Sequence, residues 1–216
     1  MMTTTVSPAV RHRDLMDTIY RRQKHIYDAT RKFYLFGRDG LIDGLDARPG
    51  AKVLEIACGT GRNLVRISRS WPGTALYGLD ISEEMLSIAR KQLASDARLE
   101  RGDASAFDAV ALFGERTFDR IVISYALSMI PQWRETIEHA CSLLSPGGSL
   151  HVVDFGDCIG LPAPLRGLLR AWLRAFHVSP REDLLAVMTE LARARNLAIR
   201  TRRGRHGYFR RITLSR

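Results

Sequence analysis

Between residues 51 and 155 the chain alternates strand-like and helix-like segments, and this alternation limits its fold more than any other feature. The apolar run at 51–57, bounded by Pro49-Gly50 and Gly59, predicts a strand, and further strands are expected at 74–79, 98–101, 118–124 and 149–155. Apolar residues at helical spacing predict helices at 62–69, from Ser82 to Leu93, and at 131–144. A chain with five such alternations is expected to fold as a doubly wound, mostly parallel sheet of the α/β class.

The two ends of the chain add elements to this sheet. Residues 14–36 lack glycine and proline and keep a helical period, which predicts a long helix. Two further helices are expected at 165–176 and 180–194, followed by strands at 197–202 and 208–214 that would form an antiparallel hairpin. We therefore expect one domain over 1–216, with an N-terminal helical cap (1–48), a ligand-binding core (49–160) and a basic C-terminal part (161–216).

Length and composition exclude several classes of protein. The 216 residues contain no apolar stretch of the roughly 18 residues that a membrane-spanning helix needs. The first ten residues lack the pattern of a secretory signal. Three cysteines without CxxC spacing argue against both a disulfide framework and a zinc site. We therefore expect a cytoplasmic protein without a metal centre.

The positive charge of the chain is confined to its C-terminal part. Residues 1–160 contain 20 basic and 20 acidic side chains, whereas residues 161–216 contain 13 and 3, which accounts for the whole net charge of +10. This asymmetry suggests contact with an anionic partner, either nucleic acid or a lipid surface. Solubility alone is the simpler explanation.

A ligand site is expected where the first two strands end, because open parallel sheets bind ligands beyond the carboxyl ends of their strands. Gly59 and Gly61 form a tight turn after the first strand, and a glycine turn lets a ligand approach the backbone closely. Asp80 ends the second strand, where a carboxylate can accept hydrogen bonds from two ribose hydroxyls. The pattern therefore predicts an adenosine-containing ligand.

The turn itself favours S-adenosylmethionine (SAM) over NAD. The dinucleotide pattern G-x-G-x-x-G fails, because its third glycine would fall on Leu64 or on Arg62. Glu55, a carboxylate inside an apolar strand, suits a cationic sulfonium ligand with a free amino group. Simpler roles remain for each residue, since Asp80 could cap the next helix and Glu55 could pair with an arginine.

The motifs together resemble class I SAM-dependent methyltransferases, which have a Rossmann-like, seven-stranded sheet. The run Val53–Asn63 is similar to their first motif, although Ala57 stands where the motif usually has glycine. The segments 77–86, 102–104, 118–123 and 144–150 are similar to their later motifs. The resemblance implies SAM as cofactor, S-adenosylhomocysteine (SAH) as product and no metal. The cofactor-binding residues that it implies are Glu55, Ala57, Cys58, Gly59, Gly61, Asn63, Asp80, Ile81, Met85, Gly102, Asp103, Ala104 and Ser124.

The predicted N-terminal helix carries the strongest indication of an acceptor site. Tyr20, Tyr27 and Tyr34 recur every seven residues on one face and alternate with basic residues. Tyrosine rings can hold a methylated ammonium, and basic side chains can hold a carboxylate or phosphate. These tyrosines could instead simply pack the helix against the domain.

This segment, together with 58–63 and 124–131, resembles the bacterial betaine-lipid N-methyltransferases, which trimethylate diacylglyceryl-homoserine. The resemblance implies an N-methyltransferase that acts on a lipid head-group amine. It also implies that the enzyme that makes this lipid is a partner of the protein. It also implies two groups of acceptor-site residues. The catalytic group comprises Tyr27, Tyr34, Tyr125 and Asp154, with Asp154 orienting or deprotonating the amine. The substrate-binding group comprises Tyr20, Arg31, Lys32 and Arg38.

The predicted helix at 165–176 suggests a peripheral membrane protein. Arg166, Arg170 and Arg174 follow one another at four-residue spacing beside an apolar arc, as in helices that lie in a bilayer interface. The same pattern would suit a lid packed on the sheet. Other acceptors also remain open, namely a soluble amine, a quinone or RNA, although we do not expect nucleic acid. A SAM-binding protein without activity is a further alternative.

Overall fold

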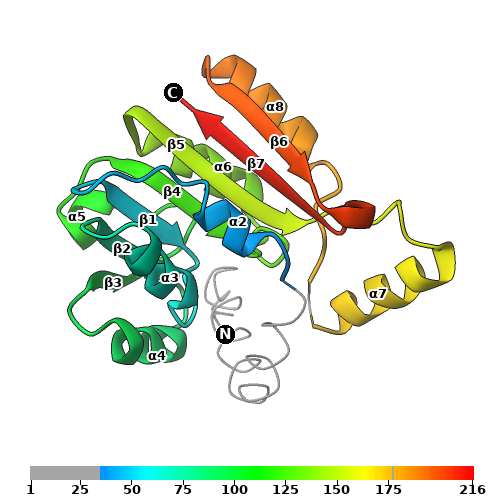
Figure 1. Ribbon diagram of the computed structural model, residues 1–216, viewed down its shortest axis with the longest axis horizontal. Coiled ribbons are helices and arrows are strands. Elements are labelled where there is room, and N and C mark those ends of the chain that lie inside the picture. Colours follow the sequence, from blue (N-terminus) through cyan, green and yellow to red (C-terminus); the bar gives the residue numbers. More distant parts are fainter. Residues whose placement is uncertain (1–34, 177) are drawn as a thin grey trace, which may run out of the picture.

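The computed structural model describes residues 35–176 and 178–216, which contain one sheet of seven strands in the order β3-β2-β1-β4-β5-β7-β6 (Figure 1). The strands are β1 (Lys52–Ile56), β2 (Ala75–Asp80), β3 (Ala97–Arg101), β4 (Phe118–Ser124), β5 (Leu144–Phe155), β6 (Ala198–Arg203) and β7 (Phe209–Ser215). The first five run parallel, whereas β7 lies antiparallel between β5 and β6. The strand order reverses at β1 and β4, where a doubly wound sheet binds its ligand.

Helices cover both faces of this sheet. The described helices are α2 (Arg38–Ile42), α3 (Arg62–Ser70), α4 (Glu83–Leu93), α5 (Ala109–Phe113), α6 (Trp133–Ser142), α7 (Ala163–Ala175) and α8 (Leu184–Ala194), with the 3-10 turn η1 (Arg205–Gly207). Residues of α2, α3, α4 and α7 share one buried apolar cluster, and residues of α5, α6 and α8 share another. Burial of these two clusters fixes which residues of each strand face which layer.

The predicted α/β fold is confirmed, including the antiparallel pairing of the last strands. The predicted start of α4 is also confirmed, because the Ser82 hydroxyl accepts a hydrogen bond from the amide of Met85. Helices α2 and α5 were not predicted, since each has only five residues, too few for a helical period to show.

Two predicted helices begin or end differently in the structure. The helix expected from 180 begins at Leu184, because Arg181 lies outside any helix and donates hydrogen bonds to the carbonyls of Leu127 and Ile130. The helix expected over 14–36 lies almost entirely outside the described residues. Its last two residues, Leu35 and Phe36, are not helical.

Helix α7 divides its apolar residues between the core and the surface. Leu173 is buried, and Leu169 and Phe176 pack against the cluster of α2, α3 and α4. Leu165 and Leu168 are instead 55% and 69% exposed. Across the described ranges, no helix is long and apolar enough to cross a membrane.

Candidate functional site

Two neighbouring cavities open where the central parallel strands end. The larger, about 270 Å³, lies beside β1, α2 and α3, and the smaller, about 40 Å³, lies beside β2 and the segment after β3. Ala57, directly after β1, lines both of them. One elongated ligand could therefore extend from the first cavity into the second.

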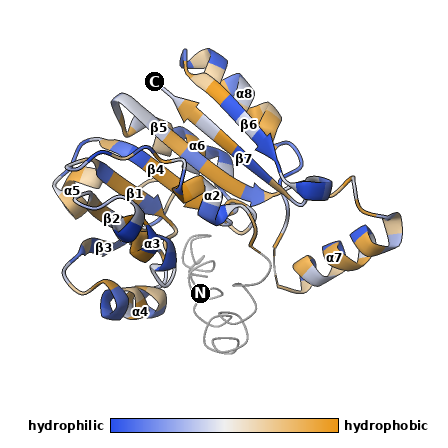
Figure 2. Ribbon diagram, in the orientation of Figure 1, coloured by the Kyte–Doolittle hydropathy of each residue, from blue (hydrophilic) through white to orange (hydrophobic). Residues whose placement is uncertain are grey.

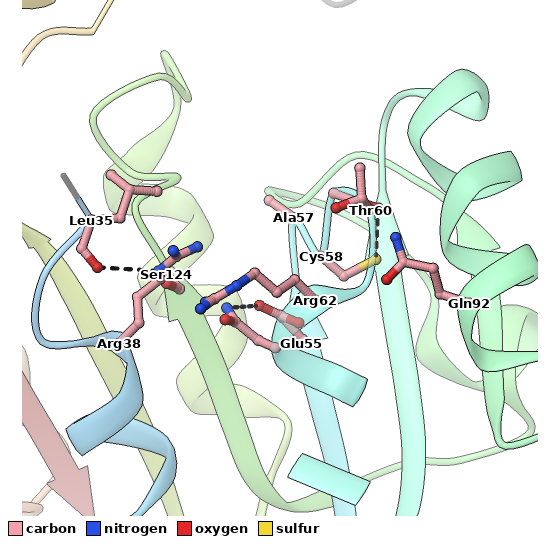
Figure 3. Close-up of a pocket in the computed structure, with 11 residues that line it drawn as sticks. Leu35, Arg38, Glu55, Ala57, Cys58, Thr60, Arg62, Gln92 and Ser124 are labelled. Atoms are coloured by element: carbon pink, nitrogen blue, oxygen red, sulfur yellow. Dashed lines mark hydrogen bonds between the residues drawn. The ribbon is translucent and has the colours of Figure 1, made fainter. Parts of the chain in front are cut away.

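Glu55 lies at the centre of the larger cavity. It is 2% exposed on β1, and its Oε1 accepts a 2.7 Å hydrogen bond from Nδ2 of Asn63 in the first turn of α3 (Figure 3). Two further polar atoms in this wall, Oδ1 of Asn63 and Oγ of Ser124, are buried and make no hydrogen bond within the described part of the chain. Because buried polar atoms are normally satisfied, these two suit a polar ligand group beside Glu55.

Side chains from several elements lie on two sides of Glu55, as Figure 3 shows. Arg38 of α2 lies on one side with its Nε donating to the Leu35 carbonyl, and Arg62 of α3 reaches toward Glu55. Thr60 and Gln92 complete the other side. The described wall thus combines one carboxylate with two guanidinium groups.

Asp80 borders the smaller cavity at the end of β2. Its Oδ2 accepts a 2.7 Å hydrogen bond from the amide of Gly59, and its Oδ1 accepts a 2.9 Å bond from the amide of Ser82. Each carboxylate oxygen can accept more than one bond, so these contacts leave capacity for ligand hydroxyls. Asp80 therefore also shapes the glycine turn, which the sequence did not reveal.

The remaining wall of the smaller cavity suits a flat apolar group. Oδ1 of Asp103 accepts hydrogen bonds from both the amide and the hydroxyl of Ser105, which fixes the loop after β3. The other lining residues are Leu79, Ile81, Gly102, Ala104, Ile130 and Gln132.

The turn after β1 requires three left-handed residues. Ala57, Gly59 and Gly61 have φ values of 58°, 55° and 78°. A Cβ on Gly59 would meet nothing within 4 Å, whereas one on Gly61 would lie 2.8 Å from Cδ1 of Leu93. Gly59 therefore leaves the cavity open, and Gly61 allows α3 to pack closely on α4. Ala57 adopts the left-handed conformation despite its methyl group, at a cost of about 1–2 kcal/mol.

Cys58 has a structural role. It is buried, and burial followed by the charge of Asp80 raises the pKa of its thiol well above the ordinary value. A thiol that stays protonated is a poor nucleophile. Its sulfur packs closely against β2, because a Cβ added to Gly78 would lie 3.0 Å from it.

The structure brings most predicted cofactor residues to the cavities, but not all of them. Gly61 and Met85 line neither cavity; Met85 is buried against Met129 and Phe176. The sequence analysis did not assign seven lining residues, of which three adjoin the predicted turn and strand end and four come from segments elsewhere in the chain. They are Leu35, Thr60, Arg62, Gln92, Leu79, Ile130 and Gln132.

The predicted acceptor residues are only partly described. Tyr20, Tyr27, Tyr34, Arg31 and Lys32 lie outside the described residues, so their predicted roles stay predictions. Arg38 lines the larger cavity, as the substrate-binding prediction requires.

Tyr125 and Asp154 are each 1% exposed and border neither cavity. The Tyr125 hydroxyl donates a 2.5 Å hydrogen bond to the Phe36 carbonyl, and burial raises the pKa of this phenol. Burial also raises the pKa of Asp154 to about 6, while its oxygens accept bonds from the amides of Ser128 and Phe155. Both side chains hold the segment after β4, and their catalytic roles remain untested.

The described residues contain no group of three histidine, cysteine, aspartate or glutamate side chains that could hold a metal ion. The donors and acceptors of the two cavities instead fit SAM. The amino acid part of SAM suits Glu55 and the two unsatisfied polar atoms, and its ribose suits Asp80.

Comparison with known proteins identifies relatives for the central part of the chain. Residues 53–148 match the family described as a methyltransferase domain. The ubiquinone/menaquinone biosynthesis C-methyltransferase of Roseobacter denitrificans is 35% identical over 147 residues, 67% of this chain and 56% of that protein. The corresponding enzyme of Cereibacter sphaeroides is 33% identical over 129 residues, 59% of this chain and 50% of that protein. The chain thus spans only about half the length of these curated relatives.

Solved structures share the fold at low sequence identity. The plantazolicin methyltransferase BpumL, in complex with a triazolic desmethylPZN analogue and SAH, has a TM-score of 0.72 at 17% identity, with 96% of each chain covered. A SAM-dependent methyltransferase from Thermotoga maritima has a TM-score of 0.67 at 18% identity, covering 93% of this chain and 99% of that one. The protein therefore has the class I methyltransferase fold, and the match to the methyltransferase-domain family lies over residues 53–148 of that fold.

Proposed function

We propose that the protein is a SAM-dependent methyltransferase. The observation that carries this proposal is the pair of cavities joined at Ala57, with Glu55 in one and Asp80 in the other. Their carboxylates stand at the two places where SAM offers hydrogen-bond donors, its amino group and its ribose. The methyltransferase-domain match and the shared fold support the same activity.

In this assignment the residues bind and orient the cofactor. Glu55, held by Asn63, binds the amino group, and Asp80 accepts bonds from the ribose hydroxyls. The loop carrying Asp103 and the side chain of Ile130 enclose the adenine. SAM supplies an electrophilic methyl group, so the protein mainly has to align an acceptor and exclude water.

For the acceptor, we propose a quinol-type ring rather than a head-group amine. The relatives from Roseobacter and Cereibacter are named as C-methyltransferases of ubiquinone and menaquinone biosynthesis. The charges of the larger cavity agree with this choice. Arg38 and Arg62 would stabilise a ring phenolate, which activates its neighbouring carbon, whereas they would repel the ammonium produced by N-methylation.

Diacylglyceryl-homoserine remains the second candidate. Its amine would face the same repulsion, but its carboxylate could pair with Arg38, in line with the betaine-lipid resemblance.

The test is methyl transfer by the purified protein from labelled SAM. A demethylated naphthoquinol, diacylglyceryl-homoserine and RNA would be offered separately, and SAH binding would be measured by calorimetry. We expect SAH binding and a single methyl added to a quinol ring carbon. Asp80→Ala should strongly weaken SAH binding and with it methyl transfer, whereas Asp96→Ala, which removes an exposed carboxylate that lines neither cavity, should leave both unchanged. Labelled lipid amine would replace the quinol proposal, and absence of SAH binding would refute the cofactor assignment.

We also propose that the protein contacts an anionic membrane through α7 and the loop before it. Ile159, Leu165 and Leu168 are 65%, 55% and 69% exposed and lie close together in sequence. Arg166, Arg170 and Arg174 lie on the same helix, which Figure 1 shows at the periphery of the molecule. Exposed apolar side chains beside arginines suit the interface of an anionic bilayer, where a lipid-soluble acceptor would reside.

Sedimentation with phosphatidylglycerol vesicles would test this contact. Leu168→Glu should reduce vesicle binding without changing stability, because the side chain is exposed. Val110→Glu is the matched control, since Val110 is 47% exposed on α5. Equal vesicle binding by both variants would argue against α7 as the contact surface.

A further inference from the structure

A third cavity, of about 180 Å³, lies between α2 and the strands β5, β6 and β7, apart from the two cofactor cavities. Arg200, Arg202 and Arg211 line it together with His151. The remaining lining residues are Gly40, Leu41, Gly44, Thr201 and Thr213. No acidic side chain is among its described lining residues.

The strand register brings the three guanidinium-bearing residues to one face of the sheet. Arg202 on β6 is the direct antiparallel partner of Arg211 on β7, and Arg200 is the partner of Thr213. Residues two apart on a strand share a face, so all three arginines project toward α2. Like charges directly opposite one another destabilise a sheet unless an anion lies between them.

At the neighbouring register position, a carboxylate neutralises the repulsion between two paired arginines. Arg203 and Arg210 are also direct partners, on the opposite face of the hairpin. There the carboxylate of Asp157 binds both, at 2.7 Å from Arg203 Nη2 and 3.1 Å from Arg210 Nη2. Within the described residues, Arg200, Arg202 and Arg211 form no ion pair shorter than 4.0 Å.

Protection of the sheet edge explains only part of this cluster. Arginines on an exposed edge strand discourage pairing with another chain, which accounts for Arg200 and Arg202 on β6. Figure 2 shows the arginine-bearing end of this strand as hydrophilic. Arg211 lies on an interior strand, and burial lowers its pKa, as does the charge of Arg202. Among the described residues, the charge of Asp43 raises the pKa of Arg211, but its carboxylate is already bound to Arg66 at 3.1 Å.

Helix α2 leaves space for a ligand beside these arginines. At Gly40 the helix backbone approaches Arg211 closely, because an added Cβ would lie 2.8 Å from its Nη1 and would force this side chain to shift. His151 is 6% exposed, and its Nε2 lies 2.8 Å from the Ser149 hydroxyl in the cavity wall.

We propose that this cavity binds a phosphate-type oxyanion between Arg200, Arg202 and Arg211. Several guanidinium groups converging on one space are the usual recognition element for such anions. The volume of about 180 Å³ admits one phosphate group with a small substituent or bound water. This site is separate from the cofactor cavities, and the proposal does not depend on methyl transfer.

The test is titration of the purified protein with inorganic phosphate in the absence of SAM, followed by calorimetry. Sodium chloride at the same ionic strength serves as the reference for general screening. We expect saturable binding by the wild type and at least tenfold weaker binding by Arg211→Gln. Arg205→Gln removes the same charge from the same hairpin outside the cavity, and it should bind phosphate within about twofold of the wild type.

Arg200→Gln provides a second variant should Arg211→Gln fail to fold, because Arg200 is exposed. Competition by phosphatidic acid vesicles would identify a lipid head group as the source of the phosphate. Absence of such competition would identify a small soluble phosphate, and both results support the site. Equal affinities in Arg211→Gln, Arg200→Gln and Arg205→Gln would overturn the proposal, as would heats reproduced by chloride.

Discussion

Replacement of Asp80 by alanine should weaken cofactor binding by a defined amount. The side chain is 7% exposed and accepts hydrogen bonds from the amides of Gly59 and Ser82. Leaving these two amides without acceptors should lower the free energy of unfolding by about 2–4 kcal/mol. Loss of two charge-assisted ribose bonds, worth about 1.5–3 kcal/mol each, should weaken SAH binding by about 10²- to 10⁴-fold.

The direct contact can be separated from the support that Asp80 gives to the turn. Calorimetry would compare SAH with its 2′-deoxy analogue in the wild type and in Asp80→Ala. If Asp80 binds the ribose, the wild type should prefer SAH by about 10- to 100-fold, and the variant should show almost no preference. An unchanged preference in Asp80→Ala would refute the ribose contact and leave Asp80 acting only through Gly59 and Ser82.

Three further predictions concern stability, each measured by chemical denaturation. Burial lowers the pKa of His151 from 6.5 to about 4, so the stability that its neutral form contributes is lost as the pH falls from 6.5 toward 4. Burial raises the pKa of Asp154 from 3.8 to about 6, so its protonation stabilises the folded protein over much of the same range. His151→Gln should therefore gain about 3 kcal/mol relative to the wild type between pH 7 and pH 4, and a constant difference would contradict the assignment. Gly61→Ala should lower the free energy of unfolding by about 2–4 kcal/mol and Gly59→Ala by only about 1–2 kcal/mol. Both substitutions strain a left-handed residue, but only the one at Gly61 also creates a clash. Equal losses would show that backbone strain alone determines the effect. Ala57→Gly should stabilise the protein by up to about 1 kcal/mol, because relief of the strain exceeds the added entropy of the unfolded chain; a loss would show that the methyl group packs favourably.

The sheet could be predicted because its strands carry an unambiguous pattern. Most residues of the β1 and β4 runs are apolar, and Pro49-Gly50 and Gly59 bound the β1 run. The short helices α2 and α5 could not be predicted, since five residues complete little more than one turn. They form because tertiary packing buries residues such as Leu41 and Phe113.

The cofactor cavities could be predicted only where the contributing residues follow strand ends. Glu55, Gly59 and Asp80 belong to two consecutive strand ends, so the general rule for parallel sheets places them together. Ile130 and Gln132 carry no comparable pattern. They reach the cavity because the segment after β4 folds back, and local sequence does not determine how far such a segment turns.

Asp154 illustrates how a residue at a strand end can serve the site without bordering it. Val153 and Phe155 pack with α2 and α3, so the intervening Asp154 points to the other face of β5. There it accepts the amide hydrogen of Ser128, while Arg181 binds the carbonyls of Leu127 and Ile130. A carboxylate and a guanidinium therefore hold the same short segment, and Ile130 at its end lines the smaller cavity. Because the segment has little regular structure of its own, its position depends on the buried Asp154 and the partly buried Arg181. The shape of the smaller cavity is therefore determined partly by Asp154 and Arg181, although neither side chain lines it.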